Sequence, residues 1–156
     1  MGAVVSIDGI PIPTTESLLP AVVIANTHCS FSSRLVVGRV GQQLVLRNDD
    51  PILHNIHLTL DTRTFMNVAL VPASRPVGKP LTKPGIYQVK CDGHNFMTAA
   101  VLAFHHPLFS VTDETGAFRI SRLPPDDHVV TIWHKTLGTF PQRITIPLRG
   151  EANVID

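Results

Sequence analysis

The sequence of 156 residues predicts an all-β protein, and three observations support this prediction. Short runs rich in valine, isoleucine, threonine and aromatic residues recur along the chain, and glycine, proline, asparagine or aspartate residues bound them. The 13 prolines and 10 glycines suit a fold with many turns. No stretch of a dozen residues keeps a helical spacing of apolar side chains. Together these features favour an antiparallel sandwich or barrel.

Before residue 105, the predicted strands begin with the N-terminal segment AVVSI, residues 3–7. The strands that follow are RLVVGRV (34–40), QQLVLRN (42–48), HNIHLTL (54–60), GIYQVKC (85–91) and TAAVLAF (98–104). Each run is short, rich in β-branched residues and bounded by turn residues. The glycines of VGRVGQQ, for example, indicate a turn between the second and third of these strands. These strands suffice for a sandwich, so residues 1–104 are predicted to form a first domain.

A smaller β segment is predicted over residues 105–156, after a seam at His105 and His106. It carries four strand signals, which include GAFRIS (116–121), HVVTIWH (128–134) and RITIPL (143–148). So short a unit buries little core by itself. Two arrangements therefore stay open. Either the segment packs on the first domain, or it recruits the strand AVVSI and the first domain is an insertion within it.

The composition excludes several classes of function. The 13 basic and 12 acidic residues are nearly balanced, and the basic residues form no run. The sequence therefore shows no positively charged segment of the kind that binds nucleic acids or anionic membranes. No apolar run approaches the roughly 20 residues that a membrane-spanning helix needs. No signal peptide is visible, and we expect one to have been removed from a precursor. The sequence offers no Ser-His-Asp order, phosphate loop or carboxylate pair, so enzyme activity is not expected.

The stretch KCDGHNFM places Cys91, His94 and Met97 three residues apart. Strand alternation puts Cys91 on the same, inward face as Tyr87 and Val89 in the run that precedes the loop. Thiolate, imidazole and thioether groups are all soft or borderline metal ligands.

A second inward donor comes from the run HNIHLTL. His54 alternates with Ile56 and Leu58 and is predicted to point inward, whereas His57 falls on the polar, solvated side. Two imidazoles, one thiolate and a weak thioether form the ligand set of a mononuclear blue-copper centre. Their joint occurrence at this spacing is a much stronger signal than a lone cysteine or histidine.

Two longer stretches extend the comparison. RVGQQLVLRNDDPILHN followed by KPGIYQVKCDGHNFMTAAVLAF resembles the cupredoxins, with the ligand-loop spacing of the amicyanin type. The segment HHPLFSVTDETGAFRISRLPPDDHVVTIWHKTLG is similar to the carboxypeptidase-regulatory-like (transthyretin-like) tail of bacterial secreted plastocyanin-like proteins. The resemblance spans roughly residues 22–146. It implies a Greek-key cupredoxin sandwich plus a small prealbumin-like β segment, and a periplasmic or secreted protein.

The resemblance also implies the roles of individual residues. The ligands of a single copper ion would be His54, Cys91, His94 and Met97. Three neighbours would surround them: Asn55, Asp92 and Phe96. Asn55 would orient the ligand loop by hydrogen bonding near Asp92. Asn95 departs from the family pattern, because a proline commonly follows the second histidine there.

Cys29 is the other cysteine of the chain, and three interpretations of it stay open. It could form a disulfide with Cys91, which would consume the thiolate. It could be a free, buried thiol. It could also be an additional metal ligand, as in a dinuclear copper centre, although the two-cysteine loop of such centres is absent.

Three functions follow as hypotheses. The first is a one-electron carrier with a type 1 copper, in which the electron would leave through His94 to a redox partner protein docked around Phe96. The second is a copper chaperone, sensor or store that exchanges the ion with a copper donor or acceptor through the same ligands. The third is a structural or binding module without metal, held by a Cys29–Cys91 disulfide.

Overall fold

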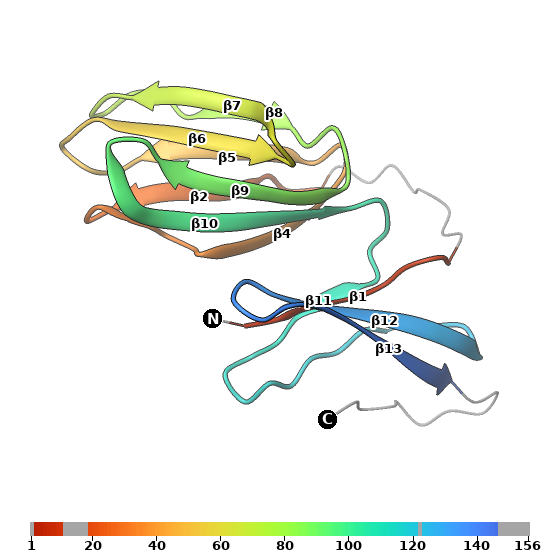
Figure 1. Cartoon of the computed structure of the whole chain (residues 1–156). Helices are drawn as coiled ribbons and strands as arrows, with labels where there is room; N and C mark the ends of the chain where they lie inside the picture. Colours follow the sequence, from red (N-terminus) through yellow and green to blue (C-terminus); the bar gives the residue numbers. More distant parts are fainter. Residues whose placement is uncertain (1, 11–18, 122, 147–156) are drawn as a thin grey trace. The chain divides into compact units, whose positions relative to one another are not determined.

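The structure is a computed structural model that describes residues 2–10, 19–121 and 123–146 (Figure 1). The described residues form strands and no helix, which confirms the all-β prediction. None of them belongs to a helix long and apolar enough to cross a membrane. The strands are β1 (Val4–Ile7), β2 (Val22–Thr27), β3 (Ser30–Phe31), β4 (Leu35–Arg39), β5 (Gln43–Asn48), β6 (His54–Leu60), β7 (Arg63–Leu70), β8 (Val77–Pro80), β9 (Gly85–Cys91), β10 (His94–Phe104), β11 (Phe109–Val111), β12 (Asp126–His134) and β13 (Gly138–Ile146).

The chain divides into two compact units, one formed by Met1–Thr15 with His106–Asp156 and the other by Glu16–His105. The N-terminal strand β1 pairs with β11 and with β12, so it lies in the sheet of the C-terminal segment. Of the two arrangements left open by the sequence, the described strands have the one in which the first unit is inserted into the second. The predicted division into 1–104 and 105–156 left open that this strand pairs with the C-terminal segment, and the pairings of β1 agree with that alternative.

The unit that contains both chain ends is a single four-stranded sheet in the order β11-β1-β12-β13. All four residues of β1 are buried. Its residues Val5 and Ile7 form a small core with Leu108 and Val130. The recruited strand therefore supplies two of the four buried side chains of this small core.

The predicted strand GAFRIS, residues 116–121, is wrong, because the structure has no strand there. The Asp113 carboxylate accepts hydrogen bonds from the backbone N–H groups of Thr115 and Ala117, which forms a local turn. Phe118 and Ile120 nevertheless pack against the core of this unit. The alternating apolar residues of GAFRIS therefore marked side chains that pack on the core, and they did not mark a strand paired in a sheet. The last residues of the predicted run RITIPL, 147–148, lie outside the described residues.

The other unit consists of two sheets around one core. The sheets have the strand orders β4-β10-β9-β6-β7 and β3-β2-β5-β8. Both contribute to a shared hydrophobic cluster, for example Ile24 and Leu44 from one sheet and Ile56 and Val101 from the other. The unit is thus a β-sandwich. Two neighbouring pairs, β4 with β10 and β2 with β5, are parallel, so the sandwich is mixed and not purely antiparallel as expected.

Tyr87 is fully buried in β9, and its hydroxyl group forms hydrogen bonds with the backbone of Lys83, just before the strand. The hydroxyl donates to the carbonyl of Lys83 at 2.7 Å and accepts from the N–H of the same residue at 3.2 Å. We expect Tyr87→Phe to lower the free energy of unfolding of the metal-free protein by about 1–2 kcal/mol, because both backbone groups lose their partner. Urea unfolding measures the change. The control is Phe96→Leu, a change at a strongly exposed side chain, and equal stability of the two variants would contradict the prediction.

Candidate metal centre

Three strands bring the predicted ligands to one end of the five-stranded sheet. His54 is the first residue of β6, Cys91 is the last of β9 and His94 is the first of β10. Cys91 is paired with His94 across the β9–β10 hairpin and with Ile56 on β6. The predicted alternation is confirmed, because Tyr87, Val89 and Cys91 are buried. His54 is likewise buried at the start of its strand.

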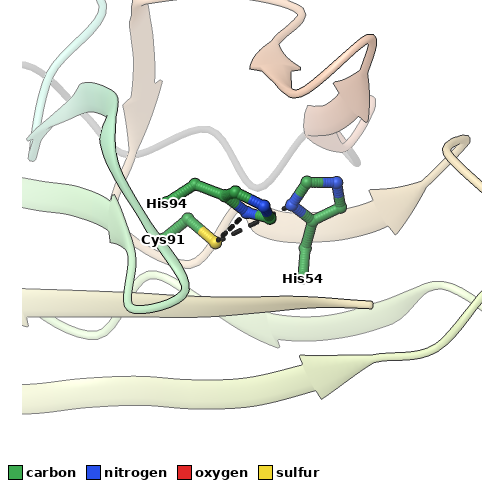
Figure 2. Close-up of side chains that lie close together, drawn as sticks. All are labelled: His54, Cys91 and His94. Carbon is green, nitrogen blue, oxygen red and sulfur yellow. Dashed lines mark hydrogen bonds between the residues drawn. The ribbon is translucent and has the colours of Figure 1, made fainter. Parts of the chain in front are cut away.

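The sulfur of Cys91 lies to one side of the two neighbouring imidazole rings, whose centroids are 4.9 Å apart (Figure 2). The distance from Cys91 Sγ to His54 Nδ1 is 3.7 Å, and the distance to His94 Nδ1 is 3.4 Å. One donor atom from each of the three residues lies within 4.8 Å of the others. His54 and Cys91 are 0% and 1% exposed, and His94 is half-buried. A thiolate and two imidazoles at these separations fit the donor set and size of a copper site.

Met97, the predicted fourth ligand, lies in an irregular part of β10. The pairing of β10 with β9 shifts between His94 and Thr98, which leaves Asn95, Phe96 and Met97 out of the regular ladder. Such bulges re-aim side chains. Met97 is buried in the same hydrophobic cluster as Cys91, whereas Asn95 and Phe96 are exposed.

The predicted contact between Asn55 and the ligand loop is present. Asn55 Nδ2 donates to Asp92 Oδ2 at 3.0 Å, and the Asp92 N–H donates to the Asn55 carbonyl at 2.9 Å. Lys90 Nζ contacts Asp92 Oδ1 at 3.0 Å, and this hydrogen bond and ion pair lower the pKa of the Asp92 carboxyl. The loop between Cys91 and His94 is therefore fixed to β6 by a charged residue at its first position.

Phe96 is 68% exposed, and its ring centroid lies 5.8 Å from that of His94. Phe96, which was predicted to lie next to the site, is thus an apolar side chain on the surface beside His94.

Sequence reasoning missed Asp50, a buried carboxylate behind His54. Asp50 Oδ2 lies 2.8 Å from His54 Nε2 and also accepts the N–H of Cys29 at 3.0 Å. Asp50 Oδ1 accepts the N–H of His28. Burial alone raises the pKa of this carboxyl, but the hydrogen bonds outweigh burial and the pKa lies below its usual value. The i,i+4 spacing in DDPILH was the one local signal that could have identified the pair.

Cys29 lies in the two-residue turn that joins β2 to β3, where Thr27 pairs with Ser30. Both turn residues, His28 and Cys29, have a φ of 52°. Cys29 and Cys91 are free cysteines in the structure, and Cys29 is half-buried. Cys29, Asp50 and His54 form a second group whose donor atoms lie within 4.8 Å of one another. Cys29 Sγ thus lies within 4.8 Å of a ring nitrogen of His54.

Comparisons with known proteins give similar solved structures but no sequence family. No family model matches the chain, and no curated protein matches it. A reduced tryptophan-to-tyrosine mutant of amicyanin matches with 18% identity and a TM-score of 0.49, over 64% of this chain and 98% of that chain. Amicyanin from Paracoccus versutus (Thiobacillus versutus) matches with 16% identity and a TM-score of 0.49, over 64% of this chain and 97% of that chain.

Proposed function

We propose that this protein binds one copper ion through His54, Cys91 and His94, with Met97 as a weak additional ligand, and that it carries one electron. The single observation that carries the proposal is the convergence of one thiol and two imidazoles from three strands within 4.8 Å. Copper prefers this combination of soft sulfur and imidazole nitrogen. When bound, it supplies a reversible couple between Cu2+ and Cu+.

The surrounding protein suits such a couple. Cys91 pairs with Ile56 and His54 with Leu70 in the β ladder of a packed sandwich, and both ligand residues are almost completely buried. A buried, rigid ligand frame keeps water away and limits the change in geometry that accompanies electron transfer. These are the properties expected of an electron carrier.

The exposed apolar side chains near the predicted ligands suit the docking of a redox partner protein. Four exposed apolar side chains lie next to ligand residues in sequence or across a strand pair: Ile52, Leu53, Val71 and Phe96. Ile52 and Leu53 directly precede His54, whose cross-strand partner Leu70 directly precedes Val71. We infer that this apolar surface receives the partner and that His94 is the exit for the electron.

The same ligands also suit a copper chaperone or store, and the half-buried position of His94 would give the ion a route in and out. The two functions differ in what happens to the ion. A carrier cycles between oxidation states at fixed copper content, whereas a chaperone gives copper to an acceptor.

The test is the addition of one equivalent of Cu(II) to the reduced, metal-free protein. We expect an intense visible band from thiolate-to-copper charge transfer, which disappears on reduction and returns on reoxidation with no loss of copper. Weak d–d absorption alone would contradict the copper–thiolate site. Transfer of copper to a partner or chelator in each cycle would favour the chaperone.

A further inference from the structure

The Asp50 carboxylate forms a hydrogen bond with Nε2 of His54, the ring nitrogen that faces away from Cys91. His54 Nδ1 lies 3.7 Å from Cys91 Sγ, and the opposite ring nitrogen, Nε2, lies 2.8 Å from Asp50 Oδ2. His54 is completely buried, and Asp50 is 7% exposed. A neutral imidazole whose Nδ1 carries no proton has its proton on Nε2. The carboxylate is placed to accept that proton in a hydrogen bond.

The carboxylate is itself held by a turn that is unusual for its sequence. A two-residue hairpin turn with positive φ at both central positions normally contains asparagine or glycine. Here the positions are occupied by His28 and Cys29, both at a φ of 52°. Their N–H groups both donate to Asp50. Left-handed backbone at such residues persists only where the surrounding structure holds it, and the Asp50 carboxylate provides that restraint.

The backbone around Asp50 is fixed as well. The N–H of Asp50 donates to Asn48 Oδ1 at 3.0 Å, and Asn48 Nδ2 donates to the carbonyls of Ile52 and Leu70. Since Leu70 is the cross-strand partner of His54, the network connects the two sheets of the sandwich at the end that carries the metal ligands. Asp50 therefore has little freedom to move away from the ring.

We propose that Asp50 is a positioning residue of the copper site: it fixes His54 with the proton on Nε2 and the lone pair of Nδ1 directed at the ion, and it favours Cu(II) over Cu(I). This inference rests on the proposed function. A carboxylate that accepts the N–H of a ligand imidazole fixes its orientation and raises its basicity as a ligand. A negative charge behind the ring also stabilises the more highly charged ion.

The group formed by Cys29, Asp50 and His54 could alternatively be a second metal position. The hydrogen bonds disfavour this, because Asp50 Oδ2 already accepts from both His54 and the Cys29 N–H. A metal there would have to displace the proton of His54 Nε2. Binding of two copper ions per chain with loss of that proton would overturn the proposal.

The first test needs no metal. Nitrogen-15 NMR of the metal-free wild-type protein reports which ring nitrogen of His54 is protonated. We expect the Nε2–H tautomer with a slowly exchanging proton, because both partners are buried. A proton on Nδ1 would overturn the proposal, whatever copper does. If the wild type instead shows no charge-transfer band, the proposed function fails, and the NMR measurement still decides separately whether His54 has the tautomer expected from its hydrogen bond to Asp50.

The second test compares the reduction potentials of Asp50→Asn and Asp49→Asn. The Asp50→Asn substitution keeps the size of the side chain but removes its charge, and Asp49→Asn removes the same charge from an exposed neighbour that pairs with Arg47. We expect Asp50→Asn to keep the visible band, to alter the copper hyperfine splitting and to weaken the preference for Cu(II) about tenfold. For one electron this equals an increase of about 59 mV in potential. Equal potentials in the two variants would overturn the proposal.

Discussion

Replacement of Cys91 by serine is expected to abolish the visible charge-transfer band of the copper-loaded protein. The band requires a thiolate on copper, and Cys91 Sγ lies close to both imidazoles, at 3.4 and 3.7 Å. Serine is nearly isosteric, so the buried end of β9 keeps its packing. Copper affinity should fall by roughly a hundredfold or more, since a neutral hydroxyl replaces a soft anionic ligand. Optical titration with Cu(II) and competition with a chelator measure both effects.

The chain provides a matched control in its other cysteine. Cys29→Ser removes a half-buried thiol from the β2–β3 turn and leaves the backbone N–H that Asp50 accepts. We expect this variant to keep the band with less than a twofold change in intensity. Loss of the band in Cys29→Ser together with its retention in Cys91→Ser would show that the wrong cysteine has been assigned to copper.

The inward positions of His54 and Cys91 could be predicted because both depend on local periodicity. A strand with one buried face alternates strictly, so apolar neighbours at i±2 mark the face of the polar residue between them. Ile56 and Leu58 do this for His54, and Tyr87 and Val89 do it for Cys91. The spacing of His94 after Cys91 then follows from a tight hairpin.

The position of Asp50 could not be predicted, because it depends on segments distant in sequence. The turn at His28 and Cys29 contacts Asp50 through backbone groups, which no side-chain pattern reveals. The same turn contains neither glycine nor asparagine, so β2 and β3 carried no hairpin signal and were not predicted. Strand β8 was missed for another reason: all four residues of Val77–Pro80 are exposed, so it has no buried face to detect.

Several expectations remain predictions. They include the prealbumin-like identity of the C-terminal segment, the periplasmic or secreted location, the redox partner and the absence of enzyme activity. The pairing of β1 with β12 explains why the C-terminal segment could not be understood from its own residues. Its sheet needs a strand that lies far earlier in the chain, as the pairing of Ser6 with Thr131 illustrates.

The two histidine ligands are expected to differ in whether free imidazole can replace them. In His94→Gly, the lost ring leaves space at a half-buried position beside the exposed residues Asn95 and Phe96. In His54→Gly, the space is enclosed, because His54 is 0% exposed and Asp50 covers its far side. Imidazole from solution can enter the first space without opening the sandwich, but it can enter the second only if the core opens.

We therefore expect both variants to lose the charge-transfer band with Cu(II) alone, and added imidazole to restore most of it in His94→Gly only. The measurement is an optical titration with imidazole at fixed copper, with circular dichroism as the control for folding. Retention of the band in His94→Gly before imidazole is added would mean that copper does not need the His94 ring. Restoration in neither variant would contradict the predicted access of imidazole to the His94 position, and restoration in both would mean that His54 is not enclosed. Under the proposed function, this asymmetry would let His54 fix the ion in the core while His94 faces a partner, as an electron exit at His94 requires.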